Sequence, residues 1–283
     1  MRKIVCESYT KEKVTFTYEF PFFLEDVEGL HEVVGNVIGI KNAFAVGENY
    51  VGTSVEKRNI VISGIIKDDF VNNRQKLYRI FPLNTTGTLY YYEDDLERKI
   101  NYKVESIKIN DKGYPKVFQI SLICHSPYFM DLVETIAKIQ NWDSLLEFPV
   151  EISSQGIEFG AKNNNTMVTI SNPSNISLGM TITFTCTGDV ENPILINAST
   201  QEKMKINHSL HSGESIVVTT HINNKTITFI DSQGNKTNII NCLVFGTKFL
   251  QVSKGENKFK PSADSGVEYL QTQISYSNYY EAV

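Results

Sequence analysis

The sequence predicts a mainly β protein of two domains: a β-rich domain with one helix, then an antiparallel β-sandwich. The 283 residues are about enough for two domains of ~150 residues each. Short β-branched runs recur between turn residues, which is the pattern of strands. From about Leu146 these runs follow one another at roughly ten-residue spacing, separated by Asn, Ser, Thr and Gly, as in a sandwich.

The first residues predict a β-hairpin. The runs KIVCES and VTFTYEF are separated by the polar turn YTKEK. In the second run Val14, Phe16 and Tyr18 fall on one face and the polar residues on the other, as in a half-buried strand. The run NIVISGII, residues 59–66, is a more continuous β-branched run and predicts a strand covered on both faces.

A single helix is predicted from Asp69 to Phe81. Asp68 or Asp69 is a suitable N-cap, and Pro82 ends the pattern. Apolar residues share one side of this segment, namely Phe70, Leu77 and Phe81. Two strands around an acidic turn should follow it, and the run KVFQISLIC, residues 116–124, should close the domain.

The predicted domain boundary lies near Pro127, which cannot donate to a sheet ladder. Beyond it, apolar residues at spacings of four and three indicate a short amphipathic helix: Leu132, Ile136 and Ile139. The prediction is therefore an N-terminal domain over 1–128, a linker helix over 129–145, and a sandwich over 146–283.

Charge and composition exclude several classes of protein. The net charge of −5 argues against a nucleic-acid-binding protein, which would present a basic face. No run of ~18 apolar residues and no secretory signal is found, so neither a membrane span nor export is expected. The four cysteines stand singly without a CxxC pair, which makes a zinc site unexpected.

Catalytic motifs are also missing. The sequence contains no GxSxG, Walker A or GxGxxG pattern. The acidic run EDDLE, residues 93–97, fits a solvated hairpin turn better than a pair of glycosidase carboxylates. His208, His211 and His221 lack an obvious carboxylate partner other than Glu214. We therefore expect no enzymatic activity, no cofactor and no metal.

The order of several motifs resembles that of siphophage distal tail proteins. The first half carries PFFLEDVEGL, KRNIVISGII, NNRQKLYRIFPLNTTGTLYYY and CHSPYF; the second half carries LLEFPVEISSQGIEFG, VENPILIN, HSGESIVVTT and VSKGENKF. This resemblance covers essentially the whole chain. It implies an N-terminal domain that forms a homo-hexameric ring at the tip of the tail tube, and a galectin-like C-terminal sandwich outside the ring.

The resemblance also implies partners and a location. Such a ring is a hub that links the tail tube protein to a tail-associated fibre or lysin protein and to receptor-binding or accessory baseplate proteins. The protein would be made in the bacterial cytoplasm and end at the virion tail tip, of a phage or of a phage-tail-like bacteriocin. No specific nucleic-acid binding and no membrane association is implied.

Polar residues on the strands 101–109 and 116–124 are candidates for the lining of the ring. They are Lys103, Glu105, Lys108, Gln119 and Ser121. Such a lining should be polar and nearly neutral, since a channel that passes DNA must not grip phosphates.

A carbohydrate-binding module that helps adsorption to the host surface is the alternative function. The segment HINNK offers His221, Asn223 and Lys225, close to the galectin pattern H-x-N-x-R. Lys lacks the planar two-donor fork of Arg, and the one Trp, Trp142, lies outside the predicted sandwich. A domain that docks protein partners is therefore the favoured prediction.

Overall fold

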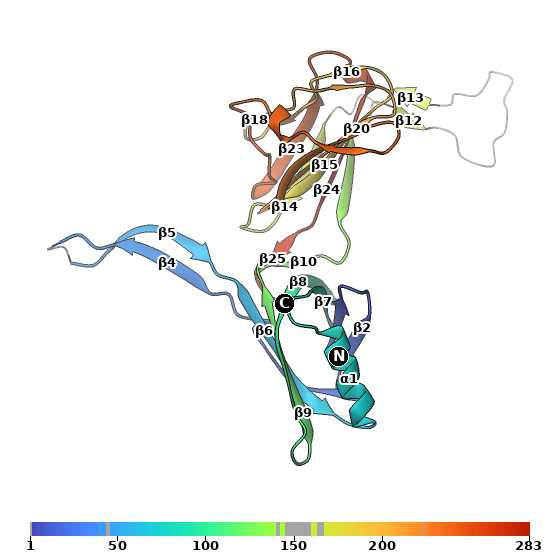
Figure 1. Cartoon of the computed structure of the whole chain (residues 1–283). Coiled ribbons are helices and arrows are strands. Elements are labelled where there is room, and N and C mark those ends of the chain that lie inside the picture. Colours follow the sequence, from blue (N-terminus) through green and yellow to red (C-terminus); the bar gives the residue numbers. More distant parts are fainter. Residues whose placement is uncertain (1, 44–45, 140–141, 145–159, 163–166, 223) are drawn as a thin grey trace. The chain divides into compact units, whose positions relative to one another are not determined.

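The computed structural model of the chain describes residues 2–283 except 44–45, 140–141, 145–159, 163–166 and 223 (Figure 1). The described residues form many antiparallel strands and one α-helix, which confirms the predicted mainly β class. The chain forms two compact units. Unit 1 comprises Met1–Leu132 together with Tyr279–Val283, and unit 2 comprises Val133–Asn278.

Unit 1 is built on a nine-stranded sheet in the order β2-β1-β7-β8-β9-β6-β3, with β10 paired to both β8 and β25. The bounds of these strands are β1 Lys3–Ser8, β2 Lys13–Phe16, β3 Phe22–Glu28, β6 Arg58–Ile66, β7 Thr86–Glu93, β8 Leu96–Asn110, β9 Lys116–Cys124, β10 Phe129–Met130 and β25 Tyr279–Tyr280. The predicted β1–β2 hairpin is confirmed, with Ile4 opposite Phe16.

The two outer strands of this sheet meet, so the sheet curls around its core. Thr17 and Phe23 form a parallel bridge, and Leu24 N donates to Thr17 O at 2.7 Å. Strand β2 ends at Phe16 rather than continuing to residue 20 as predicted, because the chain turns here towards β3. A curled sheet leaves fewer unpaired backbone groups than an open one.

Aromatic rings fill the inside of the curled sheet. The Phe16 ring lies 5.4 Å from that of Phe118, 6.1 Å from Phe22 and 6.3 Å from Phe81, measured between centroids. Helix α1, Phe70–Ile80, buries Leu77 against this cluster. The predicted helix is confirmed, but the Asp69 side chain makes no capping hydrogen bond.

Buried Arg58 joins three distant segments of unit 1. Its guanidinium donates to the carbonyls of Gly29 and Leu30, to that of Pro127 at 2.8 Å, and to that of Glu281. The Phe129 ring lies 5.0 Å below the guanidinium. The last residues of the chain are thereby held on the N-terminal unit, next to the β10–β25 pair.

A separate hairpin leaves the main sheet of unit 1. Strands β4, Gly35–Ile40, and β5, Asn49–Val55, pair with each other and with no other described strand. In Figure 1 this hairpin extends as a long arm away from β6.

Unit 2 contains two main antiparallel sheets, as a sandwich requires. One has the order β11-β24-β15-β20-β21-β22 and the other β14-β23-β17-β18. The bounds are β11 Thr135–Ile139, β14 Val168–Asn172, β15 Met180–Cys186, β17 Ile194–Asn197, β18 Glu202–Lys205, β20 Ser215–His221, β21 Asn224–Ile230, β22 Lys236–Asn238, β23 Gly255–Ser262 and β24 Leu270–Tyr276. Short pairs are β12 Trp142–Ser144 with β13 Gly160–Lys162, and β16 Val190–Glu191 with β19 Ser209–Leu210. Two 3-10 turns, Ile240–Cys242 and Val267–Tyr269, complete the unit.

The predicted linker helix over 129–145 is wrong. Residues 135–139 form β11, which pairs with β24 in the register Ile139 opposite Thr272. Ile139 is buried, whereas Ile136 is exposed, so the apolar residues do not form one helical face. The pairing with a strand distant in sequence overrides the local helical spacing.

Candidate functional site

The predicted ring-lining residues lie on the outer face of the sheet of unit 1. Lys108 pairs with Gln119, and two residues along the strands Ser106 pairs with Ser121. Side chains alternate along a strand, so these residues lie opposite the core residue Ile120. Lys103, two residues from the outward Asn101, continues the same polar face.

Glu105 joins this face through a β-bulge. The register of β8 against β9 shifts between Val104 and Ser106, which frees Glu105 from the regular alternation. Ser121 Oγ donates to Glu105 Oε2 at 2.7 Å and lies 2.9 Å from Asn59 Oδ1. The structure thus brings all five predicted lining residues together on one surface.

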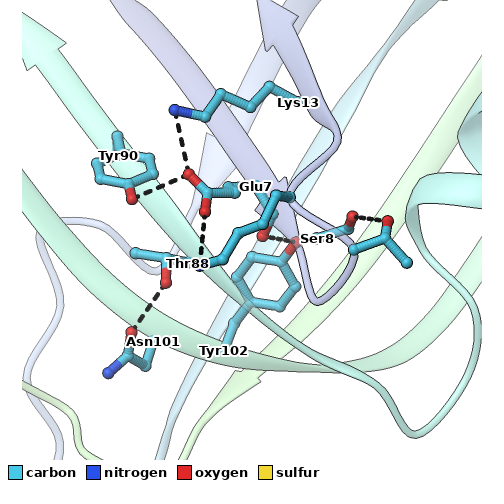
Figure 2. Close-up of polar contacts among 9 residues, drawn as sticks. Glu7, Ser8, Lys13, Thr88, Tyr90, Asn101 and Tyr102 are labelled. Atoms are coloured by element: carbon cyan, nitrogen blue, oxygen red, sulfur yellow. Dashed lines mark hydrogen bonds and ion pairs between the residues drawn. The ribbon is translucent and has the colours of Figure 1, made fainter.

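A second polar cluster, around Glu7, extends this face onto β1, β2 and β7 (Figure 2). The Glu7 carboxylate lies 3.1 Å from the amines of both Lys11 and Lys13 and accepts from Tyr90 Oη at 3.2 Å. Hydrogen bonding from Lys11 and Lys13 lowers the pKa of Glu7 against the opposing effect of burial. The Glu7 carboxylate in turn raises the pKa of Lys13. Two lysine charges are therefore compensated in part by one carboxylate.

The sequence did not indicate this cluster. Glu7 lies in a run predicted simply as a strand, and its two lysines lie in the turn that follows. The register of the predicted hairpin, which places Lys13 opposite Glu7, was a usable local signal for this ion pair, whereas the contact with Tyr90 needs the register of β1 against β7 and hence long-range information.

The arm formed by β4 and β5 presents apolar side chains on both strands. The exposed fraction is 68% for Val37 and Tyr50, and 57% for Ile40 and Val51. Several exposed apolar side chains gathered on one short hairpin favour an interaction site. The arm was not predicted, because its glycines and asparagines interrupt the β-branched pattern.

Two residues of the sugar-binding alternative, His221 and Lys225, lie on opposite faces of one sheet. His221 ends β20 opposite Asn224, whereas Lys225 pairs with Thr220, so His221 and Lys225 point to opposite faces of the sheet. The Lys225 amine lies 5.6 Å from the centroid of the Phe249 ring. Burial lowers the pKa of His221. Asn223 lies outside the described residues.

Neither a group of metal-ligating side chains nor a membrane-spanning helix is present in the part of the chain that the structure describes. Within it, no three or more His, Cys, Asp or Glu side chains are grouped so that they could hold a metal ion. No helix there has the length and apolarity that a membrane span needs.

Comparison with known families gives a match for most of unit 2. Residues 173–280 match the family described as Siphovirus-type tail component, C-terminal domain. The predicted resemblance to siphophage distal tail proteins is confirmed. No curated protein matches the chain.

Solved structures share the fold over the full length. The Dit protein of phage SPP1 is similar with a TM-score of 0.68 at 11% identity, covering 98% of this chain and 99% of that one. A chain of the phage P2 baseplate, solved in its activated conformation with Ca, gives a TM-score of 0.57 at 8% identity and covers all of both chains. The same baseplate solved with Sr gives 0.55 at 8% identity, again over both full chains.

Proposed function

We propose that this chain is a structural hub of a siphophage-type tail tip, without an enzymatic step of its own. Two findings support the proposal: the tail-component family match of residues 173–280, and the fold shared with a phage protein described as a hub adsorption apparatus. The chain would be made in the bacterial cytoplasm and built into the tail of the virion. Unit 1 forms a ring of six copies, and unit 2 carries the outer attachments.

The arm of β4 and β5 carries the assembly part of this proposal. An isolated two-stranded hairpin is marginally stable in water. This arm moreover exposes Val37, Ile40, Tyr50 and Val51, which favours a partner that covers them. In the described chain no other strand pairs with it.

A second copy of unit 1 is the partner that best fits the arm. Contact between an arm on one copy and a different surface on the next is head-to-tail, and such contacts generate closed rings when the rotation closes. Burying about 300 Å² of apolar surface per contact would stabilise the ring by roughly 7 kcal/mol before ordering costs. Six such contacts are expected around the ring.

The outer polar face of unit 1 would line the bore. Lys103 and Lys108 share this face with Glu105, while Lys11 and Lys13 share Glu7. Nearby carboxylates weaken the electrostatic attraction of these amines for DNA phosphates, which favours passage of DNA through the ring. The tail tube protein would stack on one side of the ring and a fibre or lysin protein on the other. Receptor-binding or accessory baseplate proteins would attach to unit 2.

The arm gives a direct test. Val37→Asp combined with Tyr50→Asp should abolish incorporation into particles while leaving the folded monomer intact, because both side chains are exposed in the monomer. The matched control is Val71→Asp combined with Tyr78→Asp, which places the same two charges on exposed positions of α1. Cryo-electron microscopy of particles gives the ring symmetry, and light scattering gives the mass of the free protein.

Normal incorporation of the arm variant would refute the role of the arm, and a ring without six-fold symmetry would refute the hexamer. Wild-type particles that assemble an intact tail tip without this chain would refute the hub function. The sugar-binding alternative draws no support from the opposed directions of His221 and Lys225.

A further inference from the structure

The outer face of the four-stranded sheet in unit 2 combines lysines with aliphatic side chains. Along β17 the side chains of Ile194 and Ile196 point outward, since Leu195 between them is buried. Ile196 pairs with Lys203 on β18 and with Lys260 on β23. Strands are ~4.8 Å apart, so the Cα atoms of the two lysines lie about 10 Å apart, on either side of the isoleucine.

These lysines are available to a partner. Other amines nearby are neutralised: that of Lys205 lies 2.7 Å from Asp264 Oδ2, and that of Lys248 lies 2.6 Å from Glu202 Oε1. In the described part of the chain, Lys203, Lys258 and Lys260 take part in no ion pair. Glu256 alternates onto the same outward face of β23, but the three lysines outnumber it, so a chain with a net charge of −5 carries a local excess of positive charge here.

A fully exposed aromatic ring stands beside this face. Phe245 has an exposed fraction of 103% and lies at the second position of a turn over 244–247. Thr247 N donates to Val244 O at 3.1 Å, and Gly246 supplies the positive φ of 80° that such a turn requires.

The turn is held at both ends by the edge of β18. Val244 N donates to Lys205 O at 3.0 Å, and Lys248 N donates to Lys203 O at 3.1 Å. The Phe245 ring is therefore presented on a fixed backbone next to the lysines. A preorganised aromatic anchor loses little conformational entropy when it binds, which favours its use in an interface.

We propose that the surface formed by Ile196, Lys203, Lys260 and the Phe245 turn docks an acidic protein segment whose apolar side chains pack against the Phe245 ring. The lysines select negative charge, and the ring selects a protein over a phosphate polymer, which offers no apolar side chains. This inference deepens the proposed hub function, on which it rests for the role of unit 2 in attachment. The surface itself is a property of the folded chain.

The test uses the soluble full-length protein and a library of short random peptides displayed on a carrier. Enriched peptides should contain Asp or Glu beside Leu, Phe or Trp, and should bind more weakly at high salt. Phe245→Ser should weaken the affinity of the selected peptides by about tenfold or more, as expected for an anchor residue. Lys203→Glu with Lys260→Glu should have a similar effect and reduce the dependence on salt.

The control is Lys236→Glu, an exposed lysine on β22 of the other sheet, which should leave binding unchanged. Inorganic polyphosphate serves as the competing probe. Enrichment of peptides without acidic residues, or peptide binding that survives both surface variants, would overturn the proposal. Polyphosphate binding that depends on the lysines but not on Phe245, with no peptide enriched, would overturn it in favour of a polyanion site. None of these measurements needs the ring, so the docking surface and the hub function can fail separately.

Discussion

Replacing Arg58 with Ala should destabilise unit 1 far more than a surface mutation. The guanidinium is 6% exposed and donates to four carbonyls, those of Gly29, Leu30, Pro127 and Glu281. No carboxylate bonds to it in the described structure. Its removal leaves four acceptors without their donor and detaches the C-terminal segment from two loops.

The magnitude follows from these contacts. Four hydrogen bonds at ~1 kcal/mol each and a cation–π contact with Phe129 of ~1 kcal/mol sum to about 5 kcal/mol. A pocket of about 190 Å³ is lined by Gly29, Arg58 and Pro127, so water can reach some of the released carbonyls. Rehydration and the removed cost of burying a charge should recover about 2 kcal/mol. The expected net loss is about 3 kcal/mol, or about 10 °C in the melting temperature of unit 1.

Scanning calorimetry of the full chain measures this loss, and hydrogen exchange at Tyr279 and Tyr280 measures release of β25. Arg58→Lys should fall between wild type and Ala, since an amine cannot reach all four carbonyls. The control is Arg79→Ala, which breaks an exposed ion pair with Glu12 and should cost no more than about 0.5 kcal/mol. A fall in the melting temperature of less than about 2 °C for Arg58→Ala, or unchanged hydrogen exchange in β25, would refute the proposed role of Arg58 in holding the C-terminal segment.

Three further predictions concern other parts of the fold. Gly64→Ala should destabilise unit 1 by about 2 kcal/mol in urea titrations, because an added Cβ would lie 2.2 Å from Phe23 O and 2.8 Å from the Phe118 ring; a neutral result would show that β3 can shift. The pKa of Glu7 is lowered in the folded state, so the contribution of Glu7 to stability is complete above the unfolded pKa of ~4.3 and is lost as the pH falls below that pKa. Glu7→Gln should flatten the dependence of the unfolding free energy on pH in this acidic range. An unchanged dependence would contradict the role of Glu7. Native protein should react quickly with a thiol reagent at Cys242 alone, and Cys242→Ser should remove that reaction. The other three thiols, those of Cys6, Cys124 and Cys186, are buried, and burial raises their pKa values, that of Cys124 to about 12.

Local patterns predicted the elements whose partners lie close in sequence. The β1–β2 hairpin follows from alternation across a short turn, and α1 from apolar spacing that ends at Pro82. The outward placement of Lys108 and Gln119 also followed from alternation in β8 and β9. In each case the local preference and the final packing agree.

The remaining features depend on contacts that no local pattern reveals. Residues 135–139 have helical spacing but become β11 because β24 offers a ladder more than a hundred residues later. In the sequence, Arg58 is a charged residue at the start of a predicted strand, with no sign that it is buried. Its burial depends on carbonyl groups from distant segments, including the carbonyl of Glu281. The contact of Glu7 with Tyr90 likewise needed the register of β1 against β7.

The pairing of β10 with β25 makes unit 2 an insertion with its two connections side by side. Phe129 lies opposite Tyr280 and Met130 opposite Tyr279, so the chain leaves and re-enters unit 1 on neighbouring strands, ~5 Å apart. A short turn joining these strands would close unit 1 without unit 2. Any domain whose own ends lie equally close could occupy the same place. This topology permits one inserted domain to replace another without a change in the strand order of unit 1.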